Sequence, residues 1–100
     1  MITHRADGHP VVNVGGPDYF ARLHWRLRSC LPVWTIYRPT TREYPGVWVA
    51  RMHVVLPEPR PTRFLLCHDT LEELRAILPP GLTRMDRDPG DSPEIVESWL

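Results

Sequence analysis

The side chains best suited to catalysis stand together at Cys67-His68-Asp69, which combine a thiol, an imidazole and a carboxylate. A catalytic thiol needs a base within hydrogen-bond reach of its sulfur. Consecutive side chains of a strand point to opposite faces of the sheet, so Cys67 and His68 are not expected to meet. We therefore predict that Cys67 packs in the core, that Asp69 precedes or helps to cap a helix, and that the protein is not an enzyme.

Metal-binding patterns are incomplete in this sequence. A structural zinc site takes four Cys or His ligands at close spacing, and the two cysteines lie far apart, at positions 30 and 67. Three aspartates, Asp86, Asp88 and Asp91, are spaced like part of a calcium loop, but the pattern lacks the flanking helices and the terminal-glutamate geometry of an EF-hand. We predict no metal and no cofactor. The five histidines are His4, His9, His24, His53 and His68.

The carboxylates near the end of the sequence favour a binding role instead. Turn formation alone explains Asp88-Pro89-Gly90-Asp91, because Asp, Pro and Gly are residues that turns prefer. The alternative is an acidic ridge that docks on a basic groove of a partner, as a mimic of phosphate would. The members of this candidate surface are Asp86, Asp88, Asp91, Glu94 and Glu97.

A second candidate surface is the loop Arg38–Gly46, which contains two prolines and two arginines. Tyr44, beside Pro45, has the amphipathic character of an interface anchor, and Arg42 is its charged neighbour in the same loop. The alternative for Tyr44 is a lid over one end of the core.

Charge is divided unevenly, although the formal net charge is zero. Residues 1–68 carry nine arginines against four acidic residues, and residues 69–100 carry three arginines against eight acidic residues. A net charge of zero argues against nucleic acid as a bulk electrostatic partner, but it permits two opposed patches. Arg22, Arg26 and Arg28 could contact an acidic partner or nucleic acid, or they could form a solvated helix face.

The composition predicts a single domain of a cytoplasmic protein. One hundred residues with 42% hydrophobic content suffice for one packed core. The polar first ten residues do not resemble a signal peptide, and the apolar runs are too short to span a membrane. Two separated cysteines suit a reducing compartment. All twelve basic residues are arginine, as the codon usage of a GC-rich bacterial or phage genome would produce.

The elements that must position these residues follow from periodicity and local signals. Pro17 and Asp18 favour a helix start, and Phe20, Leu23 and Leu27 share one face of a helix over Tyr19–Ser29. A second helix follows Thr70, which forms a capping box with Glu73. The predicted strands are Leu31–Tyr37, Val47–Val55, a central strand Arg63–His68, Leu82–Met85 and Glu94–Leu100.

These elements predict an α+β domain. Strands linked by short turns imply an antiparallel sheet, here of four to five strands, with one or two helices on one face. We expect residues 1–30 to form an N-terminal arm with the amphipathic helix and residues 31–100 to form the compact α+β domain. Within the arm, Val11-Val12-Asn13-Val14 could be flexible or could add an edge strand. Leu56–Pro61, with alternate prolines, is expected to form a stiff extended connection. Glu72 and Arg75 can pair on the outer face of the second helix.

The last seventy residues or so also carry a resemblance. The runs WTIYRPTTREYPGVWVARMHVV and DTLEELRAILPPGLTRMDRDPGDSPEIVESWL resemble a family of small proteins from phages, prophages and their GC-rich bacterial hosts. The resemblance implies a compact α+β domain and no established chemistry, so it supplies no catalytic residue. Residues 1–30 fall outside it.

These observations lead us to expect a non-enzymatic inhibitor encoded by a phage. By analogy with the anti-CRISPR kind, it would bind a host defence complex, such as a CRISPR effector complex, and block access of nucleic acid. Its partner is then a host protein complex, with no membrane and no direct nucleic-acid contact, in the cytoplasm of the bacterial host. The alternatives are a small nucleic-acid-binding regulator, a toxin–antitoxin accessory protein or, less in keeping with the residues, a small enzyme.

Overall fold

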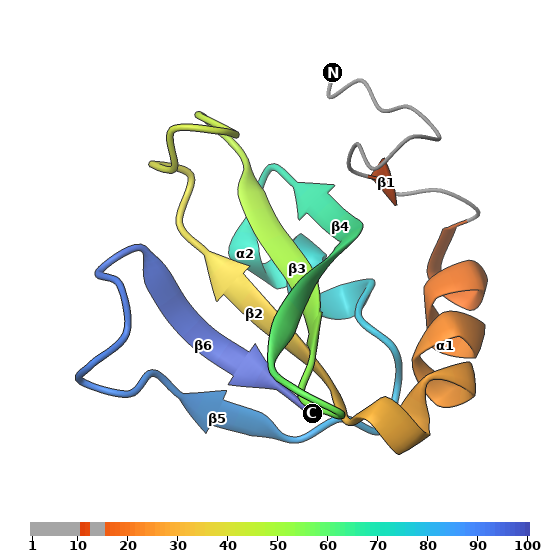
Figure 1. Cartoon of the computed structure of the whole chain (residues 1–100). Helices are drawn as coiled ribbons and strands as arrows, with labels where there is room; N and C mark the ends of the chain where they lie inside the picture. The colour runs from red at the N-terminus through yellow and green to blue at the C-terminus, as the bar shows by residue number, and fades with distance from the viewer. Residues whose placement is uncertain (1–10, 13–15) are drawn as a thin grey trace.

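The fold is built on an antiparallel sheet with one open face (Figure 1). The computed structural model of the chain describes residues 11–12 and 16–100. Within these ranges the five antiparallel strands are β2 (Pro32–Tyr37), β3 (Trp48–Val54), β4 (Arg60–His68), β5 (Arg84–Asp86) and β6 (Ile95–Trp99). They lie in the order β4-β3-β2-β6-β5. The expected α+β class with an antiparallel sheet is therefore confirmed.

The two edges of the sheet differ from each other. At one edge, the two-residue strand β1 (Val11–Val12) pairs with β4 in a parallel sense, so the edge-strand alternative for these residues is confirmed. At the other edge lies β5, which is only three residues long and whose residues are all exposed. Short, charged edge strands resist pairing with another chain.

The prediction that the third long strand is central was wrong. Strands β2 and β3 occupy the middle of the sheet, and β4 lies between β3 and the edge strand β1. The connection expected over Leu56–Pro61 is shorter than predicted, because β4 already begins at Arg60. The two prolines at its ends fall in different structures: Pro57 lies in a bend and Pro61 lies in the strand.

Local signals set the helices where they were expected. Helix α1 (Gly16–Arg26) is followed by a 3₁₀ turn, η1 (Arg28–Cys30), and helix α2 (Leu71–Ala76) follows Thr70. The Thr70 hydroxyl accepts a hydrogen bond from the Glu73 backbone N–H (3.1 Å) and donates one to the Glu73 carboxylate (2.9 Å). In the usual capping box the Glu73 carboxylate would accept from the Thr70 backbone N–H, but here it accepts from the Thr70 hydroxyl. No helix in the described ranges is long and apolar enough to cross a membrane.

Both helices pack on one face of the sheet and share a single core with it. Phe20 of α1 meets Trp34 of β2 edge to face, with ring centroids 5.7 Å apart. Helix α2 contributes Leu74, which is fully buried. The expected division into residues 1–30 and 31–100 stays a prediction, since residues 1–10 and 13–15 lie outside the described ranges. The core comprises Phe20, Leu23, Trp34, Ile36, Ala50, Met52, Leu66, Leu74 and Leu78.

The opposite face of the sheet carries a smaller apolar cluster. Cross-strand register places Val49 beside Tyr37 on one side and beside Cys67 on the other, so these three side chains share that face. Tyr44 and Val47, from the connection between β2 and β3, pack against this cluster. This connection therefore stands over the far face of the sheet, and the candidate binding site forms beneath it.

Candidate binding site

The structure places Cys67 and His68 on opposite faces of the sheet, as predicted. Cys67 packs beside Val49 and Leu65, and burial raises the pKa of its thiol to about 11, partly offset by the positive charge of Arg51. His68 pairs across the sheet with Trp48, whose side chain packs against the helix-facing core. Its Nδ1 accepts a hydrogen bond from the Asp69 backbone N–H (3.0 Å). A protonated, buried thiol is a poor nucleophile.

Cys67 is expected to resist alkylation in the native protein. At about pH 8, a thiol with a pKa of about 11 is ionised in roughly one molecule in a thousand, and burial adds a steric barrier. Iodoacetamide labelling read by peptide mass spectrometry should modify the half-buried Cys30 first and Cys67 only after unfolding in urea. Equal labelling rates for the two thiols in the native state would contradict the burial of Cys67.

The buried histidine His24 has a structural role. Its Nδ1 accepts a hydrogen bond from the Trp34 indole N–H (3.1 Å), and burial lowers the pKa of the imidazole. Burial likewise lowers the pKa of His53. Among the described residues, no three His, Cys, Asp or Glu side chains lie close enough to hold a metal ion. His4 and His9 lie outside the described residues.

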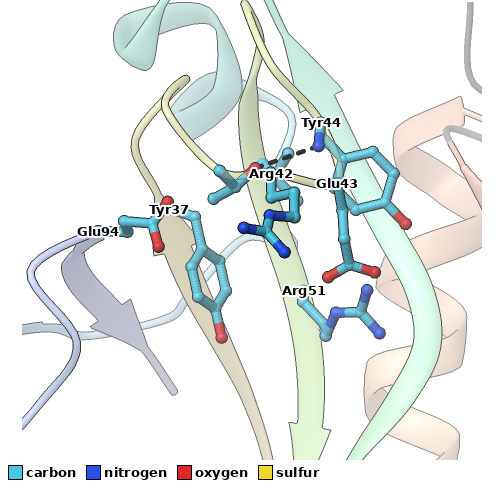
Figure 2. Close-up of a pocket in the computed structure, with 8 residues that line it drawn as sticks. Tyr37, Arg42, Glu43, Tyr44, Arg51 and Glu94 are labelled. Carbon is cyan, nitrogen blue, oxygen red and sulfur yellow. Dashed lines mark hydrogen bonds between the residues drawn. The ribbon is translucent and has the colours of Figure 1, made fainter.

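A polar hollow of about 210 Å³ lies on the far face of the sheet, at the end where β2 leaves and β3 enters (Figure 2). It combines aromatic, cationic and anionic side chains over an apolar floor. Its residues come from four segments: β2, β3, the connection between them and the residue before β6. The lining of this polar hollow is Tyr37, Thr41, Arg42, Glu43, Tyr44, Val49, Arg51 and Glu94.

Backbone hydrogen bonds fix the connection above the hollow. The Gly46 N–H donates to the Pro39 carbonyl (2.8 Å), and Gly46 adopts a positive φ of 85° that favours glycine. The Tyr44 N–H donates to the Thr41 hydroxyl (3.2 Å; dashed line in Figure 2). The Arg38 N–H donates to the Glu94 carbonyl (2.8 Å), which ties this connection to the one that enters β6.

These bonds bring together three of the residues that the sequence nominated separately. Arg42 and Tyr44 come from the connection after β2, and Glu94 comes from the residue before β6. One of the acidic candidates, Glu94, therefore meets the arginine–tyrosine candidates at one site. Tyr44 also packs on the apolar cluster beneath, as the lid alternative expects, and its role as an interface anchor stays a prediction.

The electrostatics of the polar hollow favour neutral tyrosines between fixed charges. Burial raises the pKa of Tyr37 and of Tyr44, and the positive charge of Arg51 opposes the shift in both. Arg51 is held in place because its Nη1 donates to the Thr62 carbonyl (3.0 Å). In Figure 2 the Glu43 carboxylate points toward the Arg51 guanidinium. The hollow thus offers hydroxyl and guanidinium donors together with carboxylate acceptors.

Three of the acidic candidates line a separate acidic hollow of about 480 Å³ beside β5. The Asp88 Oδ1 accepts from the Gly90 N–H (2.9 Å), and the Asp91 Oδ2 accepts from the Asp88 N–H (3.0 Å), so turn formation uses both carboxylates. The Asp86 side chain is 88% exposed, and its carboxylate pairs with Arg84 at 3.3 Å on the protein surface. The acidic hollow is defined by Asp86, Asp88 and Asp91, with Met85, Arg87, Ser98 and others.

Glu97 does not belong to the exposed acidic surface, which corrects the expectation from the sequence. It is only 2% exposed, and both of its oxygens accept hydrogen bonds from Arg75 (2.8 and 2.6 Å). The Trp99 indole N–H donates to the same carboxylate (2.7 Å). From the sequence, we expected Arg75 to pair with Glu72 on the outer face of α2. Arg75 instead binds Glu97 and so anchors α2 to β6.

Sequence reasoning missed five of the residues that line the polar hollow, among them Tyr37, Glu43 and Arg51. Alternation along β3 did place Arg51 on the face away from the helices, which was the available signal. That signal did not say what would stand above Arg51, because this depends on the path of the connection after β2.

Comparisons with protein-family models, with curated proteins and with solved structures give no match for this chain. The resemblance to small phage proteins therefore stays a prediction.

Proposed function

We propose that the protein acts by binding another protein, as a phage-type inhibitor that occupies a host defence complex of the CRISPR kind and blocks its access to nucleic acid. The observation that supports binding is the polar hollow, where Arg42, Tyr44 and Glu94 from separate segments converge. The phage and CRISPR parts of the proposal are supported by the sequence resemblance and by analogy.

The side chains of the polar hollow suit recognition of a protein. Tyr and Arg are the residue types most often found at the energetic centres of interfaces, and Tyr loses little conformational entropy when it is immobilised. The hollow has room for a side chain of the partner, whose polar atoms would meet donors from Tyr44 and Arg42 and acceptors from Glu43 and Glu94.

The neighbouring acidic hollow supplies the means of inhibition. Tyr37 of the polar hollow and Val33 of the acidic hollow belong to the same strand, β2, so the two surfaces adjoin. A partner that binds nucleic acid presents basic side chains where phosphates belong. Exposed carboxylates such as Asp86 would occupy those side chains while the polar hollow holds the complex together.

The proposal is tested by capture of the partner from a lysate of a GC-rich bacterium, with nuclease treatment and mass spectrometry. Wild-type protein is expected to recover a stoichiometric, nuclease-resistant complex that processes nucleic acid. Arg42→Glu should lose it, because an exposed charge at the rim of the polar hollow is reversed. Arg60→Glu is the matched control, since Arg60 is an exposed arginine at the other end of the sheet.

Two outcomes would contradict the proposal. Recovery of nucleic acid alone would move the function to the exposed arginines of α1 and to the alternative of a nucleic-acid-binding regulator. Equal recovery of the same complex by Arg42→Glu and wild type, with both folded by circular dichroism, would remove the polar hollow from the interface.

A further inference from the structure

A third hollow lies at the end of β2 opposite to the polar hollow, and most of its lining is apolar. Its volume is about 380 Å³, within the range of sites that hold ligand or peptide side chains. It collects three of the large apolar side chains that the described residues leave exposed: Trp25 (53%), Leu31 (51%) and Leu100 (49%). The other apolar residues of this apolar hollow include Pro32, Val33, Val55 and Leu82.

Leu31 is an unusual residue at the centre of this surface. It caps the 3₁₀ turn η1 with a φ of 53° and a ψ of 73°, in the left-handed region that glycine adopts most easily. Its side chain is half-exposed, so burial in the core does not explain leucine at this position. A role in contact with another molecule does explain it, because an exposed apolar side chain here enlarges the apolar hollow.

The charges around the apolar hollow select its occupant. Arg28 lines it, and Arg22 and Arg26 are exposed on the same helical segment as Trp25. Within the part of the chain that the structure describes, none of these three guanidiniums is paired with a carboxylate. No Asp or Glu side chain lines this hollow. A complementary ligand therefore carries negative charge beside an apolar group.

Two other occupants fit these charges poorly. The acidic hollow shares Val33 and Leu100 with the apolar hollow, so a nucleic-acid strand would run from the arginines into Asp86 and Asp88. A second copy of this chain, packed symmetrically through the same surface, would bring two sets of these arginines into one interface whose hollow has no carboxylate to meet them. Both arrangements place like charges together.

We propose that the apolar hollow binds a short segment of a partner protein that presents a bulky apolar side chain flanked by one or two carboxylates. The apolar side chain enters between Trp25, Leu31 and Leu100, and the carboxylates meet Arg28 and Arg26. Trp and Arg are again the types that dominate interface energetics. Because this surface lies at the other end of β2, its function does not depend on the polar hollow.

The test is a selection of random displayed peptides on wild-type protein, followed by synthesis of the enriched peptides and measurement of their Kd by fluorescence anisotropy. Enriched peptides are expected to combine large apolar residues with Asp or Glu. Leu31→Gly should weaken their binding about tenfold or more, and so should Arg28→Glu. Leu56→Ala, which changes an exposed leucine outside the hollow, should leave the Kd unchanged.

Leu31→Gly also separates binding from folding. Glycine accepts the left-handed backbone without strain but loses more entropy on folding, so the melting temperature should stay within about 4 °C of wild type. Absence of enrichment, enrichment of basic peptides, or peptides that bind Leu31→Gly as well as wild type would overturn the proposal. If wild type bound single-stranded RNA and Arg28→Glu did not, the occupant would be nucleic acid and the proposal would be overturned. If wild type formed a dimer in ultracentrifugation and Leu31→Gly did not, the occupant would be a second copy of this chain, which would also overturn it.

Discussion

Replacement of Trp34 by alanine is expected to lower the free energy of unfolding by about 4 kcal/mol, which is the largest loss we predict. Trp34 is fully buried between both helices and the sheet, where it meets Phe20 edge to face. Its indole N–H is also the donor to the buried Nδ1 of His24. The substitution therefore opens a cavity and leaves a buried acceptor unpaired.

Urea unfolding measures this effect, and two further variants define its cause. Trp34→Phe keeps an aromatic ring beside Phe20 but removes the N–H donor, so its loss should be about half, near 2 kcal/mol. Trp25→Ala changes the most exposed tryptophan and should cost no more than about 1 kcal/mol. If Trp34→Ala lowered the free energy of unfolding no more than Trp25→Ala does, the packing of α1 against the sheet through Trp34 would be contradicted.

Replacement of Arg75 by alanine is expected to cost about 3 kcal/mol. The substitution leaves the Glu97 carboxylate buried without its bidentate partner, and only the Trp99 N–H and Arg84, 3.8 Å away, remain near it. At roughly 4–8 °C per kcal/mol, the melting temperature should fall by about 12–24 °C. Glu72→Ala, at the partner expected from the sequence, should change stability by less than about 0.5 kcal/mol.

The same pair predicts a dependence of stability on pH. Hydrogen bonds from Arg75, then the Trp99 hydrogen bond and nearby positive charge, lower the pKa of Glu97 below its ordinary value of 4.5. A carboxyl group with a lowered native pKa stabilises the fold above its unfolded pKa. Stability should therefore fall as the pH drops below about 4.5, more steeply in wild type than in Arg75→Ala. Parallel acid transitions in the two proteins, or an equal cost for Glu72→Ala and Arg75→Ala, would contradict the pair.

Local chemistry made much of the fold predictable from the sequence. The Thr70–Glu73 capping box and Pro17 mark helix starts by hydrogen bonds and dihedral angles that involve only near neighbours. The position of β4 in the sheet was mispredicted because strand order depends on contacts between distant segments. An apolar sequence such as Arg63–His68 predicts a central strand, whether its outer neighbour in the sheet is a two-residue strand such as β1 or a longer strand.

Glu97 shows a signal that was present and not used. Glu97 and Trp99 lie two residues apart along β6, so a strand that turns Trp99 toward the helices turns Glu97 the same way. An acidic residue on a buried face requires a cation, and Arg75 is the basic residue of the facing helix. By contrast, the local spacing rule suggested Glu72 for Arg75.

The candidate site was predictable residue by residue but not as an assembly. Charge and amphipathic character predicted Arg42, Tyr44 and Glu94 as binding residues. Their convergence depends on the backbone hydrogen bond from the Arg38 N–H to the Glu94 carbonyl. Tyr37 and Arg51 join them only because the connection after β2 folds back over the far face of the sheet. The apolar hollow depends similarly on Leu31 and Leu100, which lie 69 positions apart but line one surface.

The most direct test of inhibition by occupation is the binding of labelled nucleic acid to the captured complex while this protein is titrated. Wild-type protein is expected to displace the nucleic acid, and Arg60→Glu should do the same. Arg42→Glu and Asp86→Arg should require at least about tenfold more protein, because one loses the polar hollow and the other the exposed acidic charge. Stable retention of nucleic acid in a ternary complex with wild-type protein would contradict inhibition by occupation of the nucleic-acid site.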